Sequence, residues 1–195
     1  MIRAFDIQAR AFDIQAQAFD IQERTTMNAD ELRALQAPIK QKYKDDAATA
    51  LITMHAEGKL DQPDVACHVE TFTGSARAGL HPAAGGSTDF ACSGDMLLQA
   101  LVACAGVTLN AVATAMGIEI KGGSVKAEGV MDFRGTLGMD KATPVGFQSI
   151  DLTFEVESDA SEEQLANLIR LAERYCVVYQ TLQASPAMTA KLERI

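Results

Sequence analysis

The longest apolar run in the chain extends from Gly94 to Met116 and constrains the fold more than any other feature. It follows Ser93, which suits the N-cap of a helix. As an α-helix its 23 residues would be about 35 Å long, enough to cross a bilayer. Because the polar residues Gln99 and Asn110 interrupt the run and no second run of this kind occurs, we expect a central core helix and no membrane partner.

Two segments after this run alternate apolar and polar residues, as half-exposed strands do. They are residues 124–135 and 145–157. In the second segment the apolar residues on one face are Ile150, Leu152, Phe154 and Val156. The opposite face is polar, so the pattern predicts an antiparallel sheet that is covered on one side.

A second helix follows these strands. Ser161 and Gln164 form a capping box at its start. Its apolar stripe consists of Leu165, Leu168, Ile169 and Ala172. Four residues further on, Cys176 falls on the same buried face. Since helices and strands are segregated rather than strictly alternating, the sequence predicts an α+β fold.

The part of the chain before the apolar run predicts a helix, a hairpin and a loop. Asn28 and Glu31 form a capping box that begins the helix. Residues 50–57 and 64–73 are strand-like and are joined by the turn-rich GKLDQP, which indicates a hairpin. Residues 74–92 contain four glycines and a proline, which are typical of an extended loop.

Three seven-residue repeats, AFDIQAR, AFDIQAQ and AFDIQER, occupy the N-terminus. Their Phe and Ile lie two and five residues apart, which does not form a coiled-coil seam. We interpret residues 1–26 as a tandem duplication or an over-extended start outside the core; a partner-binding arm is the alternative. Residues 27–195 then form a single domain, with residues 27–49 as its helical N-terminal segment.

Charge and cysteine usage narrow the class of function. The net charge of −9 disfavours binding to nucleic acid or anionic lipid. Charged residues run through the N-terminus where a signal peptide needs an apolar core, so we expect a cytoplasmic protein. The four cysteines include no CxxC pair and the three histidines show no ligand spacing, so no metal site is expected.

Cys104 and Cys176 both fall on the apolar faces of predicted helices. Free cysteine is often inert core filling, and the pattern alone leaves that interpretation open. Cys104 lies about ten residues into its helix, too far for the helix dipole to activate it. A reactive thiolate there would require a nearby cation.

The order of these features resembles the OsmC/Ohr family of organic hydroperoxide reductases. The stretches that carry the resemblance, over residues 50–183, are SGDMLLQALVACAGVTLNAVATAMG, DFRGTLG, VGFQSIDLTFEV and EEQLANLIRLAERYCVVYQTL. The resemblance implies antiparallel sheets packed around two central helices in an intertwined homodimer. AGLHPAAGG and ERYCVVYQTL are typical of a less characterised branch, in which His81 and Glu173 are conceivable site residues.

The resemblance also implies a site and a reaction. Cys104 would be the peroxidatic cysteine that attacks an organic hydroperoxide, and Cys176 would resolve its sulfenic acid to a disulfide. A dithiol, which is a lipoyl group in better-known members, would restore the thiols, and no metal or flavin cofactor is required. An arginine and an acid complete the family's site; Arg77 and Asp95 are the candidates here.

The sequence departs from the family pattern around these two partners. Gly94 stands where the family's glutamate commonly lies, ten residues before the cysteine, and Arg134 or Arg174 could serve instead of Arg77. The alternative is therefore a non-catalytic dimer of the same fold that binds a small apolar ligand, with structural cysteines. A thiol-dependent acyl transferase ranks last, because it would need a histidine beside the cysteine.

Overall fold

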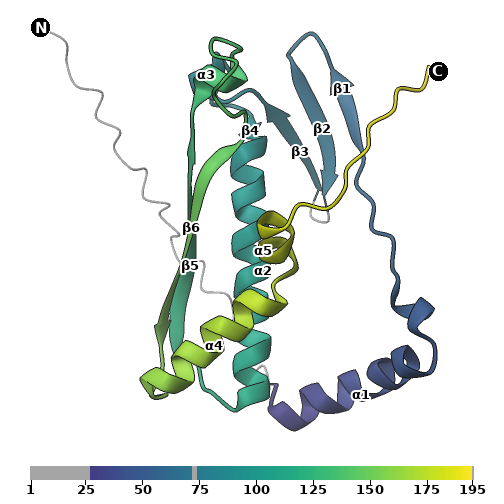
Figure 1. Cartoon of the computed structure of the whole chain (residues 1–195), viewed down its shortest axis with the longest axis vertical. Helices are drawn as coiled ribbons and strands as arrows, with labels where there is room; N and C mark the ends of the chain where they lie inside the picture. The colour runs from purple at the N-terminus through teal and green to yellow at the C-terminus, as the bar shows by residue number, and fades with distance from the viewer. Residues whose placement is uncertain (1–26, 72–73, 195) are drawn as a thin grey trace, which may run out of the picture.

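The computed structural model describes residues 27–71 and 74–194 (Figure 1). The central helix α2 (Ser93–Met116) runs along the long axis of the molecule, with a two-stranded sheet on one side and two further helices on the other. The sheet consists of β5 (Gly122–Met131) and β6 (Phe147–Glu157), and the helices are α4 (Glu162–Tyr175) and α5 (Val177–Gln183). This arrangement confirms the α+β fold.

The buried face of α2 repeats every four residues. Leu101, Ala105, Leu109 and Ala113 are all buried, and they contact β5, α4 and α5 through two clusters of apolar side chains. The helix ends at Gly117, whose left-handed conformation lets its amide reach two carbonyls of the last turn. By length and composition α2 alone among the described helices could span a membrane, but here it forms the core of the fold.

The start of α2 differs slightly from the prediction. Ser93 is its first helical residue, and Cys92 occupies the N-cap position without a side-chain hydrogen bond. The apolar run therefore forms the predicted helix, but the expected hydroxyl cap is wrong by one position.

Strands β5 and β6 pair in an antiparallel register that brings their apolar residues together. Val125 lies opposite Phe154 and Ala127 lies opposite Leu152, and all four face α2 and its neighbours. The predicted one-sided antiparallel sheet is confirmed. Its first strand ends at Met131 rather than at residue 135, because Asp132 caps the short helix α3 (Phe133–Thr136).

The second sheet has four strands in the order β1-β2-β3-β4, and only its β3-β4 pair is parallel. The strands are β1 (Gly58–Asp61), β2 (Ala66–Thr71), β3 (Gly74–Gly79) and β4 (Ala91–Cys92), and the short helix η2 (Pro82–Ala84) lies between the last two. The predicted hairpin exists, but its first strand, β1, lies within GKLDQP, where the sequence predicts the turn. The loop predicted over residues 74–92 is confirmed for residues 80–90 but is wrong at its start, where pairing with β2 imposes a strand on the small residues of β3, and at its last two residues, which form β4.

The N-terminal segment begins with α1 (Ala29–Asp45), and its predicted capping box is present. Asn28 Oδ1 accepts hydrogen bonds from the amides of Asp30 and Glu31, and the Asn28 amide donates to the Glu31 carboxylate. A short helix η1 (Ala47–Ala50) follows, and residues 51–57 then run without regular structure to β1. The seven-residue repeats lie outside the described residues.

Helix α4 begins with the predicted capping box, in which the side chains of Ser161 and Gln164 each accept a hydrogen bond from the other's amide. Its stripe packs against the C-terminal half of α2, where Leu168 and Ala172 are completely buried. The helix ends before Cys176, whose extended backbone interrupts it, and α5 continues from there. Sequence periodicity did not predict this break.

We expect Leu168→Ala to lower the free energy of unfolding by about 3 kcal/mol, because it leaves a cavity between α4 and α2. Denaturant titration measures the loss as a lower midpoint. Leu192→Ala is the matched control, since Leu192 is 90% exposed and its truncation should leave the midpoint unchanged. Equal midpoints for the two variants would contradict the assigned core.

Candidate functional site

Cys104 and Cys176 lie together in the apolar cluster between α2, α5 and the β5-β6 sheet. Cys176 is 1% exposed and belongs to this cluster with Leu101 and Ala105, and Cys104 packs against it from α2. Their side chains are close enough for the Cys176 thiol to hydrogen-bond to Cys104. Both cysteines are free thiols.

The break between α4 and α5 positions the second thiol. The Cys176 amide donates to Ala172 as the last bond of α4, and its carbonyl accepts from Gln180 in the first turn of α5. The first amides of a helix have no acceptor within it. Here the amides of Val177, Val178 and Tyr179 fall beside the two sulfurs and are their hydrogen-bond donors.

The surroundings shift the two thiols in opposite directions. Burial disfavours the thiolate of Cys104, but the amides of Val178 and Val177 and the thiol of Cys176 together outweigh it and lower the Cys104 pKa. Burial dominates at Cys176 and raises the pKa of that thiol. Cys104 is therefore the member of the pair that ionises first.

Thr108 lies one helical turn after Cys104 and also acts on it. Its hydroxyl donates a 2.7 Å hydrogen bond to the Cys104 carbonyl. The single proton of this hydroxyl can turn from the carbonyl to the Cys104 sulfur, and the hydroxyl lowers the pKa of Cys104. Sequence analysis missed this residue, although its spacing of four residues along a helix places it on the face of Cys104.

We expect Thr108→Val to raise the pKa of Cys104, because valine keeps the shape of threonine and removes the donor. The pH dependence of alkylation at Cys104, followed by peptide mass spectrometry, measures this shift. Thr108→Ser restores the hydroxyl and should return the curve toward wild type. If Val and Ser gave the same curve, Thr108 would have only a packing role.

Arg77 is held on the second sheet. Its guanidinium donates to Asp61 over 2.9 Å and to Asp64, and it lies 4.2 Å from the centre of the Phe90 ring. His68 and Arg77 together lower the pKa of Asp61. None of these contacts is with Cys104. Within the described residues they therefore do not support the role predicted for Arg77.

Asp95 lies in the first turn of α2, nine residues before Cys104. Because an α-helix rises about 1.5 Å per residue, the two residues lie about 13 Å apart along the helix axis. The Asp95 carboxylate and the Cys104 thiol therefore do not meet within one chain. The alternative arginines are also engaged elsewhere: Arg134 pairs with Asp132 over 2.5 Å and holds the pKa of that carboxyl at about 2, and Arg174 lies over the Tyr175 ring.

The remaining candidates have structural contacts. His81 caps η2 through Nδ1, which accepts from the Ala83 amide, and its ring stacks on Phe133. The Glu173 carbonyl accepts a hydrogen bond from the Gln180 side chain. Within residues 27–71 and 74–194, no three His, Cys, Asp or Glu side chains are grouped to hold a metal ion.

Fold and site together define an α+β protein with a dithiol centre between its core helix and a two-stranded sheet. The chain belongs to the family of OsmC-like proteins, whose sequence model matches residues 86–191. This match covers more than half of the chain and includes both cysteines of the pair.

Solved structures share the fold at low sequence identity. An OsmC-like protein from Mycoplasma pneumoniae has a TM-score of 0.58 and 20% identity, over 69% of this chain and 89% of that one. An organic hydroperoxide resistance protein from Elizabethkingia anophelis has a TM-score of 0.52 and 18% identity, over 69% and 91%. No curated protein sequence matches the chain.

Proposed function

We propose that the protein is a thiol peroxidase that reduces organic hydroperoxides, with Cys104 as the peroxidatic residue and Cys176 as the resolving residue. One observation carries the proposal: the two thiols lie in one apolar cluster, and hydrogen-bond donors outweigh burial and lower the pKa of only one of them, Cys104. Membership of the OsmC-like family supports it, as does the fold shared with an organic hydroperoxide resistance protein.

In the first step the Cys104 thiolate attacks the peroxide oxygen distal to the alkyl group. An S–O bond forms and the O–O bond breaks; the sulfur is oxidised to a sulfenic acid and the peroxide is reduced to an alcohol. A proton must reach the departing alkoxide. The Cys176 thiol, which hydrogen-bonds to Cys104, is the nearest donor that the described residues supply.

In the second step Cys176, as a thiolate, attacks the sulfenic sulfur of Cys104. The S–S bond forms, the S–O bond breaks and the oxygen leaves as hydroxide, which takes a proton from solvent to become water. A dithiol, such as the lipoyl group of a protein partner, then supplies two electrons and two protons and restores both thiols. The residues around the pair are apolar, which favours peroxides with an apolar alkyl or aryl group.

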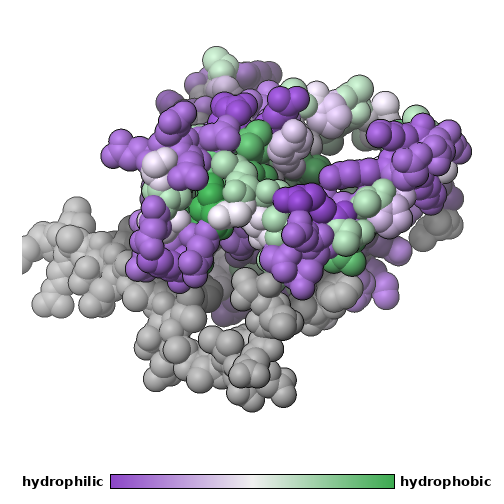
Figure 2. Space-filling view, turned by 90° about the horizontal axis from the view of Figure 1, so that it is seen from below, coloured by the Kyte–Doolittle hydropathy of each residue, from purple (hydrophilic) through white to green (hydrophobic). Residues whose placement is uncertain are grey.

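We also propose that the active form is a homodimer in the cytoplasm. Large apolar side chains stand exposed on α2 and on the segment before β1, among them Val107 at 71% and Met54 at 88%. Figure 2 views the molecule from the end where α1 and α4 lie and shows apolar side chains exposed among hydrophilic ones. A second copy that covers these residues would remove apolar surface from water.

The direct test is disulfide formation in the full chain. Adding one equivalent of an aryl hydroperoxide to the reduced protein should join the Cys104 and Cys176 peptides, detected by mass spectrometry without reduction. One equivalent of the alcohol should be released as this disulfide forms, and dihydrolipoamide should then separate the two peptides again. If the peroxide oxidised Cys67 or Cys92 and left this pair as thiols, the proposed function would be wrong.

A further inference from the structure

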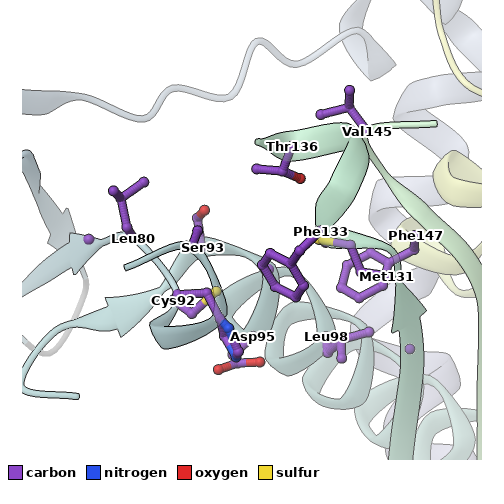
Figure 3. Close-up of a pocket in the computed structure, with 15 residues that line it drawn as sticks. Leu80, Cys92, Ser93, Asp95, Leu98, Met131, Phe133, Thr136, Val145 and Phe147 are labelled. Atoms are coloured by element: carbon purple, nitrogen blue, oxygen red, sulfur yellow. The ribbon is translucent and has the colours of Figure 1, made fainter. Parts of the chain in front are cut away.

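A pocket of about 420 Å³ opens at the N-terminal end of α2 and does not include the thiol pair (Figure 3). Its apolar side is formed by Leu98, Met131, Phe133 and Phe147, which come from α2, β5, α3 and β6. Cys92 and Ser93 lie across from them at the start of α2. The start of α2 and the segment from β5 to β6 therefore build one cavity.

Packing holds the aromatic wall of this pocket in place. The Phe133 ring stacks on His81 with centroids 4.8 Å apart, and the amide of Ala83 fixes the His81 ring. A Cβ added at Gly94 would lie 3.5 Å from both Cys92 Sγ and the Phe147 ring, so these side chains close around the glycine. A pocket formed before its ligand arrives binds without the cost of ordering its walls.

The charges around the pocket select against an anion. No lysine or arginine lines it among the described residues, and Asp95 adds a carboxylate at its edge. The whole chain carries a net charge of −9. A charged group placed against Leu98, Phe133 and Phe147 would lose its hydration, because these side chains offer it no hydrogen bond. The ligand that fits this chemistry is uncharged.

The size and shape of the cavity narrow the ligand further. A dry cavity of roughly 150 Å³ holds one benzene ring, so this volume accommodates two fused rings with a short substituent. Phe133 and Phe147 favour another ring in an offset or edge-on contact, and the Met131 thioether favours the same partner. We propose that this pocket is a second binding site, which takes a neutral aromatic molecule of about two rings.

Prodan, a neutral naphthalene whose fluorescence reports an apolar surrounding, tests the proposal in the full-length protein. We expect it to bind, to be displaced by naphthalene-2-methanol, and to resist displacement by 1-nonanol. Gly94→Leu should weaken binding by at least about tenfold, because the side chain enters the cavity. Gly94→Ala is the matched control, since its added carbon makes only ordinary contacts and leaves the cavity open.

Two further readouts locate the bound probe. Naphthalene-2-methanol should slow alkylation of Cys92, which lines the pocket, and leave that of Cys67 on β2 unchanged. Cys104→Ser should bind prodan as tightly as the wild type, because Cys104 does not line the pocket. This measurement therefore tests the second site separately from the proposed peroxidase activity. Equal affinity of the Leu and Ala variants, protection of Cys67 together with Cys92, or preferential displacement by 1-nonanol would overturn the proposal.

Discussion

Replacing Cys104 with serine is expected to abolish hydroperoxide reduction, with a fall in kcat/KM of at least about a thousandfold. The hydroxyl fits the same space on α2, but it stays protonated where the amides of Val177 and Val178 favour a thiolate. Consumption of an aryl hydroperoxide with dihydrolipoamide as the reductant measures the loss. Thermal unfolding should remain near that of the wild type, since the substitution changes a single atom.

Cys67→Ser is the matched control for this experiment. Cys67 is also partly buried, but it lies on β2 in the other sheet and outside the apolar cluster that holds Cys104 and Cys176. Its replacement should leave the rate unchanged. Full activity of the Cys104 variant, or equal losses in the two variants, would contradict the assignment of Cys104 as the nucleophile.

Cys176→Ser is expected to leave the first oxidation intact and to block its resolution. Serine can still donate a hydrogen bond to Cys104, as the thiol does, but it forms no disulfide. The sulfenic acid then persists and proceeds to sulfinic acid with excess peroxide, which adds about 32 Da to the Cys104 peptide. Trapping with a sulfenic-acid reagent, followed by mass spectrometry, shows both stages, and sustained turnover should disappear within a few cycles.

Comparison with Cys176→Ala separates resolution from activation. Alanine removes the hydrogen bond together with the resolving sulfur, so it should also raise the pKa of Cys104 and slow the first oxidation at neutral pH. Cys92→Ser, at the far end of α2, should change neither property. Stable turnover by the serine variant without over-oxidation would show that Cys176 does not resolve the intermediate.

Sequence analysis predicted correctly the elements in which buried and exposed residues alternate regularly along a single helix or strand. The four-residue repeat of α2, the alternation in β6 and the capping box of α4 each follow from local periodicity. The burial of Cys176 follows from the same stripe. The pairing of Cys104 with Cys176 did not follow from periodicity, because it depends on how α5 packs on α2; the resemblance to a family suggested it.

The predictions that failed depend on contacts between distant segments. β3 is made of small residues with low strand propensity, and only its pairing with β2 makes it a strand. The role of Arg77 came from the resemblance and stays a prediction; in the structure its partners Asp61 and Asp64 belong to the neighbouring hairpin. The donors at the start of α5 are backbone amides, which nearly every residue type carries, so the sequence could not predict them.

Because backbone amides support the Cys104 thiolate, its reactivity should depend little on salt concentration. Peptide dipoles hold no net charge that dissolved ions could screen, and they lie in an apolar interior. A thiolate supported by an exposed guanidinium would weaken as salt rises. One supported by amides should retain its reactivity at high salt, and its acidity depends on the backbone fold of α5 together with the neutral Cys176 thiol.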